Sequence, residues 1–436
     1  MQPELSPHFA ARQPSAIRRA QILFAERADR ASVRVVNLAI GNVTLPTHPA
    51  MLARLRSLGA PGSPFANGVI SYGATVGTEE AQAAFRRVIA SAGCKTDGLS
   101  CVVTDGGSPA MELALLGVCG PKATRPVLLL DPVYTNYMDM ARRIAAPTVA
   151  VRRELGADGR YAAPDLAALE RVIETHRPTA LLVIPADNPT GSYLDQATLA
   201  DLARLCVRHG LWLVSDEAYR QLHYTGAPVS SVWALTEATV PGITGRRIGI
   251  ESASKVWNAC GLRIGALVTD NPEFHRRAVA EMTANLCANV IGQHIFGALA
   301  HESDASLTAW YAQQRGYYAP LLRGVAEGLR RELPGVLVSS PDAALYSVVD
   351  VKALVPASFD AAEFVGWCAQ HGRVRDPDGS DYTLLVAPLA GFYGERRPGD
   401  GTATRMRLAF VEPPDLIARV PRLFAALLRG YLATTP

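Results

Sequence analysis

Short apolar runs alternate with amphipathic segments through the middle of the chain. The runs lie within residues 101–120, 126–137, 179–184, 211–224, 247–251 and 262–268. Continuous apolar runs bounded by Gly, Pro, Asp and Asn are typical of strands that are buried on both faces of a parallel sheet. Because these strands alternate with helical segments, the pattern predicts an α/β fold.

Helical periodicity appears before, between and after these strands. An amphipathic helix is expected at 14–27, and another begins at Thr78, which is followed by two acidic residues in the first turn. In the 101–120 segment, Pro109 is expected at the first helical position. Further helices are predicted at 273–301 and 305–331, and further strands within 35–46, 344–351 and 404–411.

Composition and charge exclude several classes of protein. The 436 residues are 49% hydrophobic and 19% charged, and a formal net charge of +3 gives no sign of a nucleic-acid surface. No run approaches the ~18 apolar residues of a membrane helix, and residues 1–30 carry charges where a signal peptide is apolar. The 7 cysteines form no CxxC pair, and the histidines show no metal-ligand spacing. We therefore expect a cytoplasmic protein with free thiols, no structural metal, and no nucleic-acid or membrane partner.

The stretch from Ser252 to Gly265, with Lys255 inside it, lies between two apolar runs. A lysine at the mouth of a buried sheet loses solvation, which favours the neutral amine that forms Schiff bases. Taken alone, a lysine is more often a solvated surface charge. Ser252, Ser254 and Arg263 add two hydroxyls and a guanidinium around it, and these groups suit a phosphate.

Ser-x-Ser-Lys, followed eight residues later by Arg263, resembles the pyridoxal phosphate lysine motif of fold type I aminotransferases of class I/II, the aspartate aminotransferase superfamily. The resemblance extends over about residues 35–415. It implies a large cofactor-binding domain, residues 51–314, built on a mostly parallel seven-stranded sheet. It also implies a small α/β domain made from both termini, residues 1–50 and 315–436.

The resemblance implies a cradle for the cofactor phosphate. A helix that begins after a glycine turn offers free backbone N–H groups and a favourable dipole. Gly107 and Ser108 at this turn hold the phosphate in the family, together with Ser252 and Arg263. Tyr72 matches the tyrosine that reaches the cofactor phosphate of the neighbouring subunit, so the resemblance implies a homodimer with shared active sites.

The resemblance also assigns contacts to the cofactor ring. Tyr134 is the aromatic residue expected to stack on the ring, with Tyr137 the second choice. Asn188 in Asn-Pro-Thr-Gly hydrogen-bonds the phenolic oxygen in the family, and Tyr219 donates to the same oxygen. Asp216, directly after an apolar run, keeps the ring nitrogen protonated, which makes the ring an electron sink.

Substrate contacts are expected from both ends of the chain. Gly41 lies in a loop that closes over the substrate in the family, and Asn188 lines the same site. Arg407 resembles the arginine that binds the substrate α-carboxylate, and Arg405 is the alternative two residues away. Acidic-substrate relatives carry an arginine in the stretch that matches 283–293, but this chain has no basic residue there. This departure speaks against aspartate or glutamate as the preferred donor.

Together these residues imply an aminotransferase that moves the amino group of an L-amino acid to a 2-oxo acid. Lys255 would carry pyridoxal 5'-phosphate as an internal aldimine and then act as general base. A lyase, decarboxylase, racemase or oxidase of an amino acid on the same fold remains the alternative, because the same carbanion can lose other groups. A transcription regulator is not expected, because only ~30 residues precede the fold and none form a basic recognition helix. The motifs do not identify the amino acid or the oxo acid.

Overall fold

The apolar runs form a seven-stranded sheet in the computed structural model, which describes residues 3–394 and 401–434. In sheet order the strands are β2 (Ser100–Thr104), β8 (Gly265–Thr269), β7 (Arg247–Ser252), β6 (Trp212–Asp216), β5 (Ala180–Val183), β3 (Val127–Asp131) and β4 (Thr148–Arg152). Only β8 runs antiparallel to its neighbours. The predicted α/β class and mostly parallel seven-stranded sheet are therefore confirmed.

Both faces of this sheet are covered, as the continuous apolar runs require. On β3, Val127 and Leu129 belong to one buried cluster, and Leu128 and Leu130 belong to the other. The first cluster includes residues of α5 (Gly107–Val118), α6 (Asn136–Arg143) and α9 (Pro272–Met282). The second includes residues of α4 (Glu79–Ala90), α7 (Leu166–His176) and α8 (Gln196–His209).

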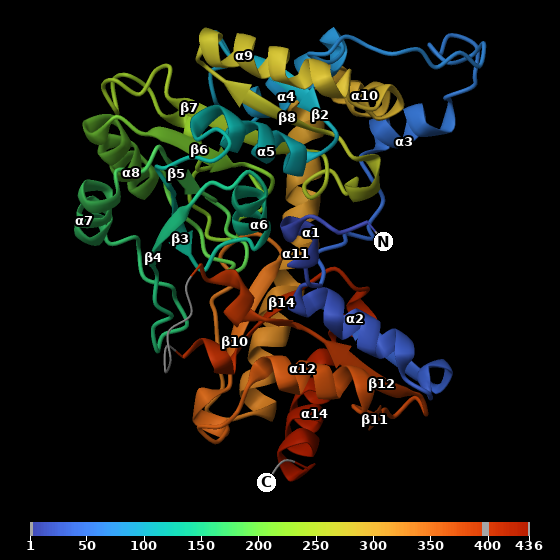
Figure 1. The fold of residues 1–436 in the computed structure, drawn as a ribbon. Helices are drawn as coiled ribbons and strands as arrows, with labels where there is room; N and C mark the ends of the chain where they lie inside the picture. Colours follow the sequence, from blue (N-terminus) through green and yellow to red (C-terminus); the bar gives the residue numbers. More distant parts are fainter. Residues whose placement is uncertain (1–2, 395–400, 435–436) are drawn as a thin grey trace.

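A second lobe joins the two ends of the chain (Figure 1). One small sheet has β1 (Val33–Asn37) parallel to β12 (Asp381–Leu385), which also pairs with β11 (Val374–Arg375). The other has the order β13 (Ala387–Pro388), β14 (Arg405–Ala409), β10 (Tyr346–Asp350), β9 (Leu337–Val338). Helix α11 (Asp304–Glu332) runs from one lobe to the other, and Figure 1 shows it behind both. The predicted domain boundary at 314/315 falls inside this helix, so the exact division stays a prediction.

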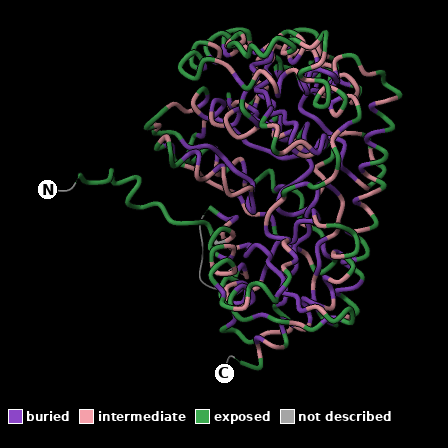
Figure 2. Tube along the Cα trace, turned by 90° about the vertical axis from the view of Figure 1, so that its right-hand side faces the viewer, coloured by how far each residue is buried: buried purple, intermediate pink, exposed green. Residues whose placement is uncertain are grey.

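The remaining helices surround these sheets. They are α1 (Pro7–Ala10), α2 (Ala16–Glu26), α3 (Pro49–Arg56), α10 (Val290–Gly297), α12 (Ala361–Gln370), α13 (Pro414–Ile417) and α14 (Val420–Thr434). Figure 2 shows buried chain in the interior of both lobes and an exposed N-terminal segment that extends away from the body. None of the helices described here is long and apolar enough to cross a membrane.

Two details of the helix prediction were wrong. Helix α5 begins at Gly107, so Pro109 is its third residue and not its first. The segment 273–301 is not one helix, because Leu286 adopts a positive φ of 67° and Asn289 caps a new helix by accepting hydrogen bonds from two backbone N–H groups. Helix α2 and the start of α4 after Thr78 agree with the prediction.

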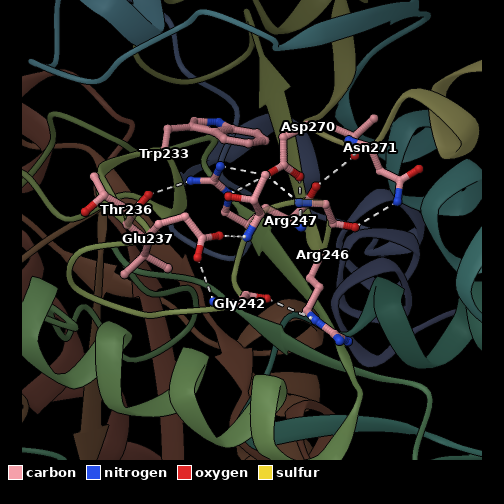
Figure 3. Close-up of polar contacts among 12 residues, drawn as sticks. Trp233, Thr236, Glu237, Gly242, Arg246, Arg247, Asp270 and Asn271 are labelled. Atoms are coloured by element: carbon pink, nitrogen blue, oxygen red, sulfur yellow. Dashed lines mark hydrogen bonds and ion pairs between the residues drawn. The ribbon is translucent and has the colours of Figure 1, made fainter.

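A polar network surrounds the start of β7, at the end of this strand opposite to Lys255 (Figure 3). Arg247 opens β7 and pairs with Asp270 at 2.6 Å between Nη2 and Oδ2, while its Nη1 donates to the Leu235 carbonyl at 2.6 Å. The Glu237 carboxylate accepts from the N–H of Gly242 at 2.7 Å. Because β7 begins in this network and ends at Ser252, the network fixes the strand that presents Lys255.

Candidate active site

A cavity of about 450 Å³ lies at the carboxyl ends of the large-sheet strands, where the second lobe faces them. Eleven of the twelve predicted site residues line it: Gly41, Gly107, Ser108, Tyr134, Asn188, Asp216, Tyr219, Ser252, Lys255, Arg263 and Arg407. The twelfth, Tyr72, is 81% exposed and is not part of the lining. The structure thus brings together residues that are up to 366 positions apart, and leaves the tyrosine predicted to serve a partner on the surface.

Lys255 projects into the cavity from the loop that follows β7. Its Nζ donates to the Gly41 carbonyl at 2.5 Å and lies 3.9 Å from Cys260 Sγ. The Cys260 thiol donates in turn to the Ser254 carbonyl at 2.8 Å. No described carboxylate forms a salt bridge with Nζ, so the amine is held by neutral groups and remains available to a ligand.

The start of α5 and Arg263 form a cradle that only glycine permits. Gly106 has φ 104°, and a Cβ placed there would lie 2.4 Å from Arg263 Nη2. A Cβ on Gly265 would lie 2.5 Å from the Gly107 nitrogen, so β8 and the turn are in direct backbone contact. The Arg263 guanidinium donates to the Cys260 carbonyl at 3.0 Å and has no described carboxylate partner. Free N–H groups at a helix start and an unneutralised guanidinium suit a phosphate group.

Asp216 closes β6 and presents its carboxylate to the cavity. The Tyr137 hydroxyl and the Ala218 N–H donate to it, the latter at 3.0 Å. Burial raises the pKa of the Asp216 carboxyl, and the hydrogen bond from Tyr137 opposes this rise. In the described residues no guanidinium or ammonium forms a salt bridge with Asp216, so its carboxylate has no cationic partner and suits a protonated ring nitrogen.

Two tyrosines have contacts that the sequence did not predict. Tyr137, considered only for ring stacking, packs edge-on against Tyr134 at 5.5 Å and donates to Asp216. Tyr346 lines the cavity, and its hydroxyl lies 2.7 Å from that of Tyr219. Burial raises the pKa of Tyr219 well above its ordinary value, which keeps the phenol protonated. Tyr346 could have been found only once β10 was paired with β14, because that register places it on the same face as Arg407.

Arg407 is a buried cation held by neutral groups. Its Nη1 donates to Asn188 Oδ1 at 3.2 Å and its Nη2 to the Ala39 carbonyl at 2.5 Å, while Nε is buried without a partner in the described structure. The guanidinium carbon lies 4.6 Å from the Tyr346 ring centroid and 5.1 Å from that of Phe392. Burial lowers the pKa of Arg407, and a carboxylate ligand would reverse that shift. The alternative, Arg405, pairs instead with Asp350 at 2.9 Å and does not line the cavity.

A buried charged triad supports the strand ends beneath the cavity. Arg220 makes two hydrogen bonds to Glu251, at 2.6 and 2.8 Å, and a longer one of 3.4 Å to Glu217. Glu217 follows Asp216 and Glu251 precedes Ser252 along the chain. The triad therefore fixes the relative position of two predicted cofactor-binding residues.

Helix α2 contributes a part of the lining that the sequence did not predict. Ser15, Ile17, Arg18 and Gln21 all face the cavity. The periodicity of 14–27 predicts the helix, but no local signal indicates where the helix packs.

Comparison with known proteins places the chain in a family. The family model "Aminotransferase class I and II" matches residues 33–376. The chain is 29% identical to the arginine–pyruvate transaminase of Pseudomonas aeruginosa over 320 residues, 70% of each chain. It is 26% identical to an aspartate aminotransferase of Streptomyces avermitilis over 269 residues, and this match spans 62% of each chain.

Solved structures share the fold over nearly the whole chain. The aspartate aminotransferase of Thermus thermophilus with maleate has a TM-score of 0.79 at 22% identity, covering 98% of this chain and 100% of that one. The N-succinyldiaminopimelate aminotransferase of Mycobacterium tuberculosis has a TM-score of 0.77 at 23% identity, covering 97% and 100%. With most of its length matched by the family model and its cavity residues at the expected motifs, the chain belongs to the aminotransferase class I and II family.

Proposed function

We propose that this protein is a pyridoxal 5'-phosphate-dependent aminotransferase that moves the amino group of an L-amino acid to a 2-oxo acid, with Lys255 as its catalytic base. The observation that carries the proposal is the convergence of Lys255, Asp216, Arg263 and Arg407 in one cavity. When bound, the cofactor supplies an electron sink for negative charge at the substrate α-carbon.

Three groups of residues would hold the cofactor. Arg263, the N–H groups at the start of α5 and the hydroxyls of Ser108 and Ser252 suit its phosphate. Asp216 would keep the ring nitrogen protonated, because the buried carboxylate gains a cationic partner there. Tyr134 offers an aromatic face, and Asn188 and Tyr219 offer hydrogen-bond donors.

The substrate would be held and deprotonated by residues of both lobes. Arg407 would bind the α-carboxylate through the N–H groups that Asn188 and the Ala39 carbonyl leave free, with its unpartnered Nε among them. Lys255 Nζ then removes the α-proton as general base. The Gly41 carbonyl, 2.5 Å from Nζ, keeps the amine at the side of the cavity where the second lobe lies.

We also propose a homodimer in which Tyr72 serves the partner's site. Its exposure in the single chain, next to exposed Val69 and Ile70, is compatible with an interface. The cytoplasmic location expected from the sequence stays a prediction.

The test is a half-reaction with cofactor-loaded protein and single L-amino acids, without an oxo acid acceptor. We expect one class of amino acid to be converted to about one equivalent of oxo acid per site, because its amino group stays on the enzyme until an acceptor arrives. Lys255→Ala should release none while keeping the wild-type circular dichroism spectrum. Accumulation of carbon dioxide, ammonia or peroxide would replace transamination by the alternative chemistry, because none of these is a product of the half-reaction.

A further inference from the structure

A second cavity, of about 550 Å³, lies between helix α11 and the loop that follows Tyr219. Of the described residues, none lines both this cavity and the active site. The described lining contains two arginines, Arg315 and Arg323, and no acidic residue. Neither arginine forms a salt bridge with a carboxylate in the part of the chain that the structure describes. The cavity therefore carries an excess of positive charge that the proposed function does not use.

The two arginines lie along one side of α11, with small residues between them. Arg315, Ala319 and Arg323 follow one another at intervals of four residues, which is the spacing of neighbours on a helix face. The two arginines are separated by about 12 Å along the helix axis, a gap that two long side chains can close around one ligand. Gly316 and Ala319 line the cavity between them and leave this space open.

Neutral oxygens of the loop orient both guanidinium groups. Arg315 Nη1 donates to the Gln221 carbonyl at 3.1 Å and to Gln221 Oε1 at 3.4 Å. The exposed Arg323 donates through Nη2 to the Tyr224 carbonyl at 3.5 Å. Gln221 is buried and has a φ of 81°, which a residue with a side chain rarely adopts. The loop thus holds the two positive charges beside the cavity without neutralising them.

A buried histidine adds a polar group without a partner to the cavity wall. His223 is 8% exposed, and its Nδ1 is buried with no hydrogen-bond partner in the described structure. Its ring stacks on that of Tyr193, with the centroids 4.7 Å apart, so the ring is fixed in place. Burial and the charge of Arg315 lower the pKa of His223. A negatively charged ligand in the cavity would offset the charge of Arg315 and relieve this effect.

We propose that this cavity is a second anion site, outside the active site, that binds a phosphate group between Arg315 and Arg323, with His223 in its wall. A phosphate monoester carries a charge of about −1.5 to −2 at pH 7 and three strong acceptor oxygens. It therefore serves two guanidinium groups at once, whereas a carboxylate offers one charge and two oxygens. The site is additional to the cradle at Arg263, which belongs to the other cavity.

A short stretch of chain connects this site to the active site. Gln221 follows Tyr219 by two residues, and the Leu222 N–H donates to the Tyr219 carbonyl at 2.9 Å. The opposite wall of the cavity is α11, which reaches both lobes. A phosphate group that joins the helix to the loop would stabilise the position of the segment that carries Asp216 and Tyr219.

The test uses inorganic phosphate and cofactor-loaded protein, in which the cofactor occupies the cradle at Arg263. Calorimetry at constant ionic strength, with chloride as the replaced anion, measures the affinity. We expect Arg315→Gln and Arg323→Gln each to weaken phosphate binding at least about tenfold, because each removes charge-assisted hydrogen bonds. Arg331→Gln changes an exposed arginine of the same helix outside the cavity and should bind phosphate as the wild type does.

The exposed position of Arg323 keeps the test valid if Arg315→Gln fails to fold, which circular dichroism would show. No phosphate binding by the wild type below about 10 mM would overturn the inference. Equal binding by the wild type and the folded variants would also overturn it, because the phosphate would then bind elsewhere, such as at Arg407. The titration needs no turnover, so its result stands even if transamination fails.

A titration with glycerol 3-phosphate identifies the source of the phosphate group. Tighter binding than that of inorganic phosphate, lost in Arg323→Gln, would assign the site to a phosphate ester. Equal or weaker binding would assign it to the free ion.

Discussion

Individual charged residues differ in whether an opposite charge already neutralises them. Arg220 and Arg405 are bound to carboxylates, and neither lines the cavity. Arg407 and Asp216 are held by neutral groups, and burial shifts the pKa of each toward the uncharged form. A buried charge without a partner is costly unless a ligand supplies one. This contrast separates residues that stabilise the fold from residues that we propose to bind a cofactor or substrate.

A substitution of Tyr137 tests the role that we propose for Asp216. Tyr137→Phe removes a hydrogen bond to the carboxylate, so the pKa of Asp216 should rise further. Less of the carboxylate is then ionised at a given pH. We expect kcat to fall about tenfold, since a hydrogen bond to a charged group is worth about 1.5–3 kcal/mol. The acidic limb of the pH–rate profile should move to higher pH.

Tyr134→Phe is the matched control. It removes a neighbouring hydroxyl that does not contact Asp216 and leaves the ring in place. Its acidic limb should coincide with that of the wild type. A shift of equal size in both variants would mean that Tyr137 does not act through Asp216.

Among the secondary-structure elements, one charged cluster holds several helices together beside the large sheet. Glu80 on α4 accepts two hydrogen bonds from Arg54 on α3, at 2.7 and 2.6 Å. Arg54 also donates to the carbonyl of His294 on α10 at 2.6 Å, and His301 lies 2.7 Å from Glu80. The cluster links α3 and α4, which flank Tyr72 in the sequence, to α10 and to His301 after it.

Glu80 should therefore make stability depend on pH. Hydrogen bonds from Arg54 lower the pKa of Glu80 from 4.5 to about 2. A carboxyl with a depressed pKa stabilises the folded state above its unfolded pKa, and this contribution is lost as pH falls from 4.5 towards 2. Glu80→Gln should cost about 1 kcal/mol at pH 7, since the pair is partly exposed, and progressively less below pH 4.5.

Urea unfolding of both proteins at pH 7 and pH 3, at one protein concentration, measures this difference. Glu79→Gln, which changes the exposed acid next to it, should shift the unfolding free energy by less than about 0.5 kcal/mol at either pH. A stability difference between Glu80→Gln and wild type that stays constant from pH 7 to pH 3 would contradict the assignment.

Most elements were predictable because their signals are local. The run from Val127 to Asp131 is apolar because both of its faces are covered, and Thr78 caps α4 because its hydroxyl meets the third N–H. The break between α9 and α10 was missed because apolar residues continue across it. The capping role of Asn289 follows the positive φ at Leu286, which the apolar pattern does not show.

Across the whole molecule, the motif residues were predictable and the other cavity residues were not. Lys255, Asp216 and Arg263 lie at strand ends or in loops that link strands. The order of the motifs along the chain was enough to predict that they share one site. Tyr346 and Arg18 reach the cavity only through the pairing of β10 with β14 and the return of the N-terminal helix to the second lobe. Such long-range packing leaves no periodic trace in a single sequence.

The largest scale is that of the homodimer that we propose, in which each site would need Tyr72 from its partner. The exposed apolar residues Val69 and Ile70 precede it in the chain. The Gly73 N–H donates to Cys287 Sγ at 3.3 Å, which brings the exposed Leu286 close to the same segment. The N-terminal segment also extends away from the body (Figure 2). Exposed apolar patches usually mark contacts with another chain.

Mixing two inactive variants tests whether sites are shared. Lys255→Ala lacks the base, and Tyr72→Ala should leave the site largely empty at limiting cofactor. In a mixed dimer, one site combines the native Lys255 of one chain with the native Tyr72 of the other. Random exchange of equal amounts makes half the dimers mixed, so activity should return to about a quarter of wild type. If Tyr72 served its own chain, no combination would restore a site, and the mixture would stay as inactive as its components.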